Sequence, residues 1–197
     1  MTVPPFAGIG NTEEGRALAT RIRLVGLDVD GVLTDGGIYL GDVAGQRLEF
    51  KRYEIQDGLG IKMLQKAGIL VAIITGRVSE SVALRARELG VDDLVQDVHA
   101  RKLIALRELA ARHGVGFDEV AFVGDDLPDV GVLQVVGLPV VVANASADAR
   151  AAARFTLSRR GGDGAIREFA EVLLNTRGEW NALATWYVES RASGASA

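Results

Sequence analysis

Apolar runs of strand length alternate with helical patterns through most of this chain. The runs are continuously apolar, as expected of strands covered on both faces of a sheet, and occupy residues 22–29, 69–75, 93–97, 119–125 and 138–144. Helical patterns between and after them predict helices at residues 57–67, 79–89, 100–112, 128–136 and 146–153. This alternation predicts an α/β fold with a parallel sheet and helices on both of its faces.

Three segments depart from the alternation. Residues 36–51 hold two short alternating stretches around a glycine-containing turn, which predicts a β-hairpin projecting from the sheet. Residues 1–21 are expected to form a mobile leader that ends in a short helix. Residues 164–190 are expected to form one or two helices, with a frayed end at 191–197.

Composition narrows the class of protein. The chain has 197 residues, enough for one domain with a substantial core, which we place at residues 22–178, before a C-terminal helix and tail at 179–197. A net charge of −4 disfavours a general nucleic-acid binder, and the lack of cysteine excludes disulfides, thiolate catalysis and zinc–cysteine sites. No apolar stretch approaches the roughly 20 residues of a membrane span, and the N-terminus does not resemble a secretory signal. We therefore expect a cytoplasmic protein without membrane partners.

Polar motifs lie where the predicted strands end. Asp28 and Asp30 close the first strand, and further motifs follow at residues 75–77 (Thr-Gly-Arg), at Lys102 and at residues 124–126 (Gly-Asp-Asp). Ligands of open parallel sheets bind outside the carboxyl ends of the strands. The motifs are therefore expected to meet at one site.

The residue types at this site favour phosphate chemistry. Carboxylates placed close together repel one another and need a cation, and oxygen donors without histidine or sulfur favour Mg²⁺. Lys102 would supply a positive charge for a phosphate, and Thr75 a hydroxyl and a backbone N–H at a helix start. One aspartate can attack phosphorus while the other transfers protons. The pattern therefore predicts a Mg²⁺-dependent phosphomonoesterase.

The motifs also carry a resemblance. In this order, "DVDGVLTDG", "ITGR", a lysine before a helix and "VGDDLPD" resemble the four motifs of the haloacid dehalogenase (HAD) superfamily. "RYEIQDGLGIKMLQKAGI" and "GGDGAIREFAEVLL" are similar to its small phosphatases of the 3-deoxy-D-manno-octulosonate 8-phosphate (KDO 8-phosphate) phosphatase type. The resemblance covers roughly residues 22–175. It implies a Rossmann-like HAD fold without a cap domain, which agrees with the short stretch between Thr75 and Lys102.

The resemblance implies a role for each motif residue. Asp28 matches the nucleophile and Asp30 the general acid/base. Thr75, Gly76 and Lys102 match the positions that bind the phosphate.

Metal binding and support are implied in the same way. Asp125 matches the Mg²⁺ ligand that joins the Asp28 carboxylate and the Asp30 backbone carbonyl. Asp126 matches a second acidic position, expected to orient the lysine or a metal-bound water, and Arg77 either reaches substrate or pairs with an acidic neighbour.

The resemblance further implies a small sugar-acid phosphate as substrate, a place in lipopolysaccharide biosynthesis and a homotetramer in which the hairpin 36–51 covers a neighbour's open site. The chain departs from the family pattern at Gln56 and Asp163, where a basic residue is usual. The phosphate of a nine-carbon sugar acid, such as deaminated neuraminic acid (KDN) 9-phosphate, therefore stays open as an alternative substrate.

The stretch that leads to the phosphate-binding lysine, "QDVHARKL", is one residue longer than is usual in the family. Arg101 therefore stays open as an alternative to Lys102.

Other interpretations compete with catalysis. A phospho-acceptor receiver module also uses Mg²⁺, an aspartate and a lysine, and a non-catalytic oligomerisation module could share this fold. Asp129 could bind metal or only complement the dipole of the helix it begins; we favour Asp125 for the metal and leave Asp129 as structural. His113 is expected at the C-terminus of a helix, and Trp180 and Trp186 are expected to pack against the body or another subunit.

Overall fold

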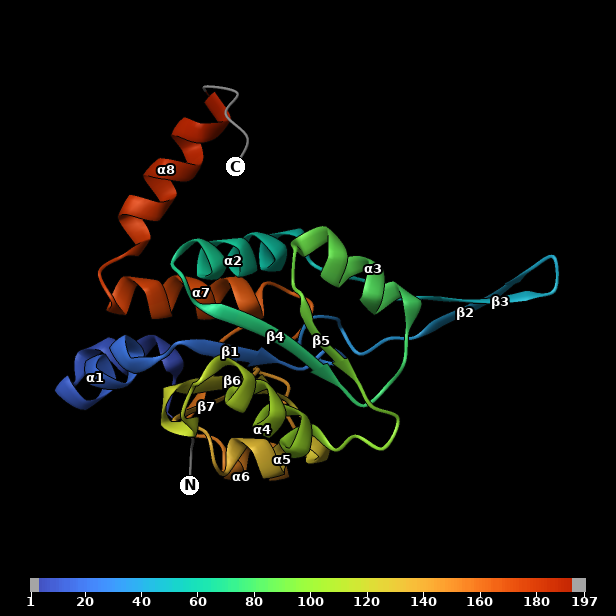
Figure 1. Cartoon of the computed structure of the whole chain (residues 1–197), viewed down its shortest axis with the longest axis horizontal. Helices are drawn as coiled ribbons and strands as arrows, with labels where there is room; N and C mark the ends of the chain where they lie inside the picture. Colours follow the sequence, from blue (N-terminus) through green and yellow to red (C-terminus); the bar gives the residue numbers. More distant parts are fainter. Residues whose placement is uncertain (1–3, 193–197) are drawn as a thin grey trace.

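The computed structural model describes residues 4–192 and is built on a six-stranded parallel sheet with strand order β5-β4-β1-β6-β7-β8 (Figure 1). Every pair of neighbouring strands in it is parallel. The strands are β1 Leu24–Leu27, β4 Leu70–Thr75, β5 Asp93–Gln96, β6 Val120–Gly124, β7 Leu138–Val141 and β8 Phe155–Thr156. The parallel sheet predicted from the apolar runs is confirmed, and the two-residue strand β8 is an addition that the sequence did not signal.

Helices cover both faces of the sheet and enclose two apolar cores. In β1, Val25 and Leu27 point into one core and Leu24 into the other, which is why the strand is apolar at successive positions. The first core lies under α1 Glu13–Arg21, α2 Ile55–Lys66, α3 Glu80–Leu89 and α7 Ala165–Thr176. The second lies under α4 Lys102–His113, α5 Val130–Leu133 and α6 Ala147–Ala152. Among the described helices, none is both long and apolar enough to cross a membrane.

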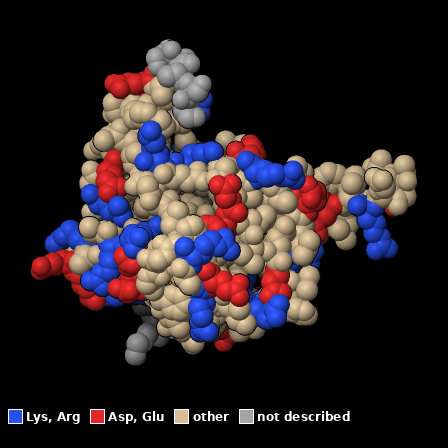
Figure 2. Space-filling view, viewed as in Figure 1, with Lys and Arg blue, Asp and Glu red and all other residues tan. Residues whose placement is uncertain are grey.

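A hairpin projects from this body, as the sequence predicts (Figure 1). It pairs β2 Tyr39–Val43 with β3 Gln46–Phe50 in antiparallel register, and its turn holds Ala44 and Gly45 at positive φ. Figure 2 shows most of its surface as uncharged. Its exposed apolar side chains are Tyr39, Leu40, Val43 and Phe50.

The leader differs from the expectation. Residues 4–11 are not a loose segment, because η1 Phe6–Asn11 is a 3-10 helix packed on the first core. Phe6 is fully buried, and its ring stacks on that of Phe169 at 5.1 Å between centroids. Pro5 adds a bridge to Thr156 in β8. The predicted short helix that follows is present as α1.

The C-terminal region contains two helices, α7 and α8 Trp180–Ala192, which are joined through Gly178, where φ is 76°. Helix α8 stands away from the sheet (Figure 1). Arg167 of α7 lies over the Trp180 ring and Lys66 of α2 over the Trp186 ring, so both tryptophans contact the body. The frayed end expected at 191–197 is not found at residues 191 and 192, which belong to α8, and residues 193–197 lie outside the described part of the chain.

Candidate active site

A cleft of about 240 Å³ opens at the carboxyl ends of the central strands. Its lining brings together the motifs that the sequence placed at strand ends, since it includes Asp28, Asp30, Thr75, Gly76, Arg77, Lys102, Asp125, Asp126 and Asp129. The expected convergence of the motifs is therefore found in the structure.

Asp28 directly follows β1 and is held in line with the sheet. Its backbone N–H donates to the Val123 carbonyl at 3.1 Å, which extends the parallel ladder by one residue. The chain then turns at Gly31, where φ is 91°. A Cβ atom at Gly31 would lie 2.1 Å from an Asp125 carboxylate oxygen. Glycine is thus required here both by the backbone and by the close approach of the β6 motif.

Lys102, the first residue of α4, reaches back into the cleft. Its Nζ donates to Asp28 Oδ1 at 2.6 Å and to Asp129 Oδ1 at 2.7 Å, and all three side chains are buried. Although burial alone would lower the pKa of Lys102, the charges of Asp28 and Asp129 raise it above its usual range. An ammonium group has three N–H donors, so one remains for a ligand.

Carboxylates crowd the same place. Oxygen atoms of Asp28, Asp125 and Asp129 lie within 4.8 Å of one another. Burial, and then the charge of Asp129, raises the pKa of Asp28 well above its usual range, although Lys102 acts in the opposite direction. Burial likewise raises the pKa of Asp125 to about 6. One lysine does not balance these acids, and their oxygen donors fit a hard divalent cation.

Thr75 and Gly76 end β4 beside this cluster. The buried Thr75 hydroxyl accepts a hydrogen bond from the Arg77 N–H at 3.3 Å. A Cβ at Gly76 would lie 2.9 Å from the Cβ of Ala100, so the loops before α3 and α4 are in close contact. The expected helix start is not found at Thr75, because α3 begins at Glu80.

Asp129, and not Asp126, holds the lysine. Of the two roles expected of Asp126, that of orienting the lysine is not found, since Asp126 is exposed and Lys102 bonds to Asp129 instead. The other, orienting a metal-bound water, stays a prediction. The other oxygen of Asp129 accepts from the backbone N–H groups of Asp125 at 2.9 Å and Asp126 at 3.3 Å. The 3-10 turn Leu127–Asp129 folds this carboxylate beneath the motif, where it fixes both the loop and the lysine. The interpretation of Asp129 as only a partner of the helix dipole does not account for these hydrogen bonds.

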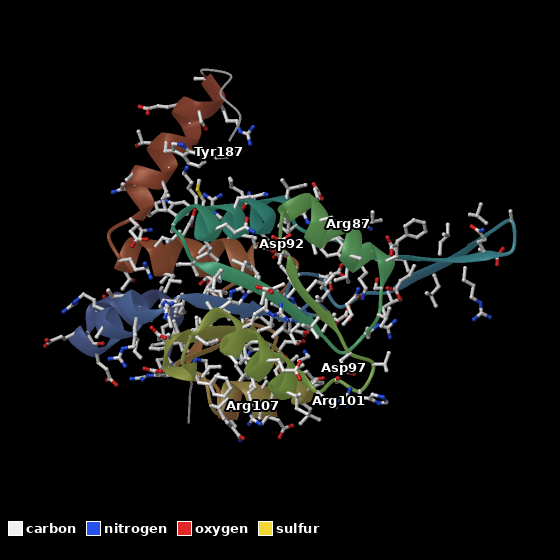
Figure 3. All side chains as sticks on the ribbon, in the orientation of Figure 1. Arg87, Asp92, Asp97, Arg101, Arg107 and Tyr187 are labelled. Atoms are coloured by element: carbon white, nitrogen blue, oxygen red, sulfur yellow. The ribbon has the colours of Figure 1, made fainter. Side chains whose placement is uncertain are left out.

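Arg101 does not replace Lys102. Its side chain is 60% exposed and pairs with Asp97, with Nε 2.8 Å from Oδ2, on the loop that follows β5 (Figure 3). His113 ends α4 as expected, and Gly114 follows it in the left-handed conformation.

Sequence reasoning missed Lys51. Its side chain is fully buried and pairs with Asp30 at the edge of the cleft. Arg77 also pairs with an acidic neighbour, Glu49, with its Nη2 atom 2.9 Å from Oε2. The only local signal was the place of Lys51 at the end of the predicted hairpin 36–51.

Comparisons with known proteins identify the family of this chain. Residues 95–169 match the family model of the haloacid dehalogenase-like hydrolases. The 3-deoxy-D-manno-octulosonate 8-phosphate phosphatase KdsC of Escherichia coli K12 is 42% identical over 163 residues, which are 83% of this chain and 85% of KdsC. The chain belongs to this family of HAD-like phosphatases. A receiver module is thereby excluded.

Solved structures extend the likeness to three dimensions. A 3-deoxy-D-manno-octulosonate 8-phosphate phosphatase from Moraxella catarrhalis, solved with magnesium, phosphate and KDO, is 37% identical and matches with a TM-score of 0.81. The match covers 87% of this chain and 97% of that one. A probable phosphatase from Pseudomonas syringae is 40% identical with a TM-score of 0.83, covering 90% of this chain and 98% of its own. The predicted HAD fold is confirmed, and the chain is a phosphatase of this family.

Proposed function

We propose that this phosphatase hydrolyses the phosphate monoester of a sugar acid, with KDO 8-phosphate as its substrate and Mg²⁺ as its cofactor. The observation that carries the proposal is the buried contact of Lys102 with Asp28 beside Asp125, in a chain 42% identical to KdsC. Lipopolysaccharide biosynthesis follows as the setting in which KDO is used.

The residues present fit the metal. Asp28 and Asp125 offer carboxylate oxygens, and the backbone carbonyl of Asp30 is the third ligand that the family resemblance implies. Bound Mg²⁺ offsets the charge of the carboxylates and of the phosphate as the two approach each other.

Asp28 is the proposed nucleophile. One carboxylate oxygen forms a bond to phosphorus while the bond from phosphorus to the sugar oxygen breaks, which leaves an aspartyl-phosphate. Water then attacks the same phosphorus, the bond to the Asp28 oxygen breaks and inorganic phosphate is released. Lys102 orients the Asp28 carboxylate and supplies positive charge to the phosphoryl oxygens, to which the Thr75 hydroxyl and the Gly76 N–H donate hydrogen bonds.

Asp30 is the proposed general acid and base. Its carboxyl lines the same cleft and is partly exposed, so it can meet both a leaving group and water. It gives its proton to the departing sugar oxygen in the first step and takes one from the attacking water in the second.

We further propose that the chain forms a homotetramer in which the hairpin of residues 36–51 covers a neighbouring site. The exposed apolar side chains of Tyr39, Leu40 and Phe50 on a projecting ribbon support this, because such a surface is costly to leave in water.

The alternative substrate, KDN 9-phosphate, rests on Gln56 and Asp163. Both side chains are exposed, and a neutral and an acidic residue stand where the family usually has a basic one.

Hydrolysis of p-nitrophenyl phosphate with Mg²⁺ tests the chemistry, and a panel of KDO 8-phosphate, KDN 9-phosphate and hexose phosphates tests the substrate. We expect Asp28→Asn to abolish turnover while the protein stays folded, and the exposed Asp148→Asn, on α6, to serve as the matched control. Preference for KDN 9-phosphate would overturn the proposed substrate but not the phosphatase chemistry. A stable tetramer without turnover of any phosphate would instead favour the non-catalytic oligomerisation module.

A further inference from the structure

Four charged side chains form a closed ring at the base of the hairpin. Lys51 Nζ donates to Asp30 Oδ1 and lies 3.8 Å from Glu49 Oε1. Arg77 closes the ring, with Nε 3.8 Å from Asp30 Oδ2 and Nη2 2.9 Å from Glu49 Oε2. Charges alternate around the ring, so each side chain has an oppositely charged neighbour on either side.

Burial separates the two cations of this ring. The Lys51 side chain is 0% exposed, whereas that of Arg77 is 49% exposed. A buried ammonium is costly unless it is paired, and the only carboxylates within 4 Å of it in the described chain are those of Asp30 and Glu49. A substrate entering the cleft can reach Arg77 but not Lys51. Lys51 therefore acts on protein atoms and not on substrate.

The backbone holds Lys51 firmly in this place. It follows β3, whose last residue Phe50 pairs with Tyr39, and it precedes an isolated bridge between Tyr53 and Thr34. The backbone of Lys51 thus lies between two cross-strand pairings, which fix the point from which its side chain reaches Asp30.

Each acid of the Asp-x-Asp motif has a lysine of its own. Lys102 bonds to Asp28 from the α4 side, and Lys51 bonds to Asp30 from the hairpin side. We propose that Lys51 is a positioning residue that holds the Asp30 carboxyl where it exchanges a proton with the leaving group and the attacking water. This inference rests on the proposed function, because it assigns a support to the proposed general acid.

Leaving-group dependence tests this role. The protein with Mg²⁺ is assayed on 2,4-dinitrophenyl, p-nitrophenyl and phenyl phosphate, whose leaving groups need protonation increasingly in this order. We expect Lys51→Met to lower kcat/KM on phenyl phosphate about 100-fold and on 2,4-dinitrophenyl phosphate less than about threefold, since general acid catalysis contributes at least about 100-fold. The exposed Lys62→Met, on α2, removes the same charge away from the cleft and should leave all three rates unchanged.

The outcomes separate the two proposals. If the unmodified protein hydrolyses none of the three esters, the proposed phosphatase activity fails. If it does hydrolyse them and Lys51→Met slows all three equally, or none, the positioning role is overturned.

Two further variants test whether Lys51 acts through Asp30 and guard against a folding defect. In an Asp30→Asn background, Lys51→Met should add no further leaving-group dependence, because the group it positions is gone. Should Lys51→Met fail to fold, Lys51→Arg keeps the charge but alters its geometry, and the same selective loss on phenyl phosphate is expected, in a smaller degree. An equal loss on all esters in Lys51→Arg would contradict the proposal.

Discussion

Lys102 Nζ lies 2.6 Å from Asp28 Oδ1 although 74 positions separate the two residues in the chain. The contact joins the end of the central strand β1 to the start of α4, and it is buried on both sides. Asp129 completes it from a third element. A lysine held by two acids cannot turn away from the cleft, so the sheet topology itself determines where positive charge meets an incoming phosphate.

The first prediction follows from this contact. Asp129→Asn should lower kcat/KM for p-nitrophenyl phosphate about 100-fold, because Lys102 loses one of its two anionic partners and shifts in the cleft. Steady-state kinetics in the presence of Mg²⁺ measure the effect, and circular dichroism checks the fold.

Asp148→Asn is the control, since it removes the charge of an exposed acid on α6 that does not line the cleft. We expect its kcat/KM to stay within about threefold of the unmodified protein. Similar losses in both variants would contradict the assignment of the lysine-holding role to Asp129.

The second prediction concerns Mg²⁺ and pH. A carboxyl must lose its proton to bind a metal, and in the metal-free protein the pKa of Asp125 is raised to about 6. Mg²⁺ affinity should therefore be level above that pH and fall roughly tenfold for each unit below it, more steeply if the raised pKa of Asp28 adds a second proton.

Thermal denaturation with and without Mg²⁺ measures this dependence. At pH 7.5, Mg²⁺ at 100 times its Kd should stabilise the fold by about 2.7 kcal/mol, and the gain should shrink toward pH 5. Asp125→Asn should lose the gain at every pH, whereas Asp148→Asn should keep it. A stabilisation by Mg²⁺ that persists in Asp125→Asn would place the metal elsewhere.

The sequence predicted the sheet and most of the site because both depend on order along the chain. Asp28, Thr75 and Asp125 each follow an apolar run, and parallel strands bring their carboxyl ends together whatever the details of the loops. Local pattern alone was enough to find them.

The residues that were missed depend on how the chain turns in space. Lys51 is buried only because the base of the hairpin folds over Asp30, and Asp129 reaches Lys102 only because a 3-10 turn brings it beneath the loop. Phe6 stands in a glycine-containing segment without helical or strand periodicity, so nothing nearby marked it as part of the core. Such contacts are decided by tertiary packing.

The third prediction tests the hairpin. Deleting residues 40–46 removes most of the ribbon but leaves Lys51 and the sheet in place. If the ribbon covers a neighbouring site, KM for KDO 8-phosphate should rise while the free energy of unfolding of the subunit changes little. Sedimentation velocity on the same sample should show a smaller assembly. An unchanged KM would reject the shared site.

The fourth prediction tests the packed leader. Phe6→Ala should lower the free energy of unfolding by about 3–5 kcal/mol, because it empties a fully buried ring position against Phe169. Ile104→Ala, at a half-exposed position of α4, should cost less than about 1 kcal/mol. Urea denaturation compares the two variants. Equally small losses of unfolding free energy in both would show that the leader is a loose segment and not part of the core.

The fifth prediction concerns Asp57, a buried acid far from the cleft chemistry. From α2 its Oδ1 accepts a hydrogen bond from the Arg167 N–H at 2.8 Å, so it caps the first turn of α7, where Gly164 offers no side chain. Burial raises its pKa to about 6, although the backbone N–H groups of α7 act in the opposite direction.

A raised acid pKa means that the folded chain binds this proton more tightly than the unfolded chain. Stability contributed by the group is therefore present below pH 4 and is lost as pH rises to about 6, by roughly 3 kcal/mol over the window. Asp57→Asn cannot ionise, so its free energy of unfolding should not show this decline between pH 4 and pH 6. The exposed Asp118→Asn should keep the decline of the unmodified protein. If urea denaturation gives Asp57→Asn the same pH dependence as Asp118→Asn, the buried carboxyl already ionises below pH 4 and the α7 amides outweigh its burial.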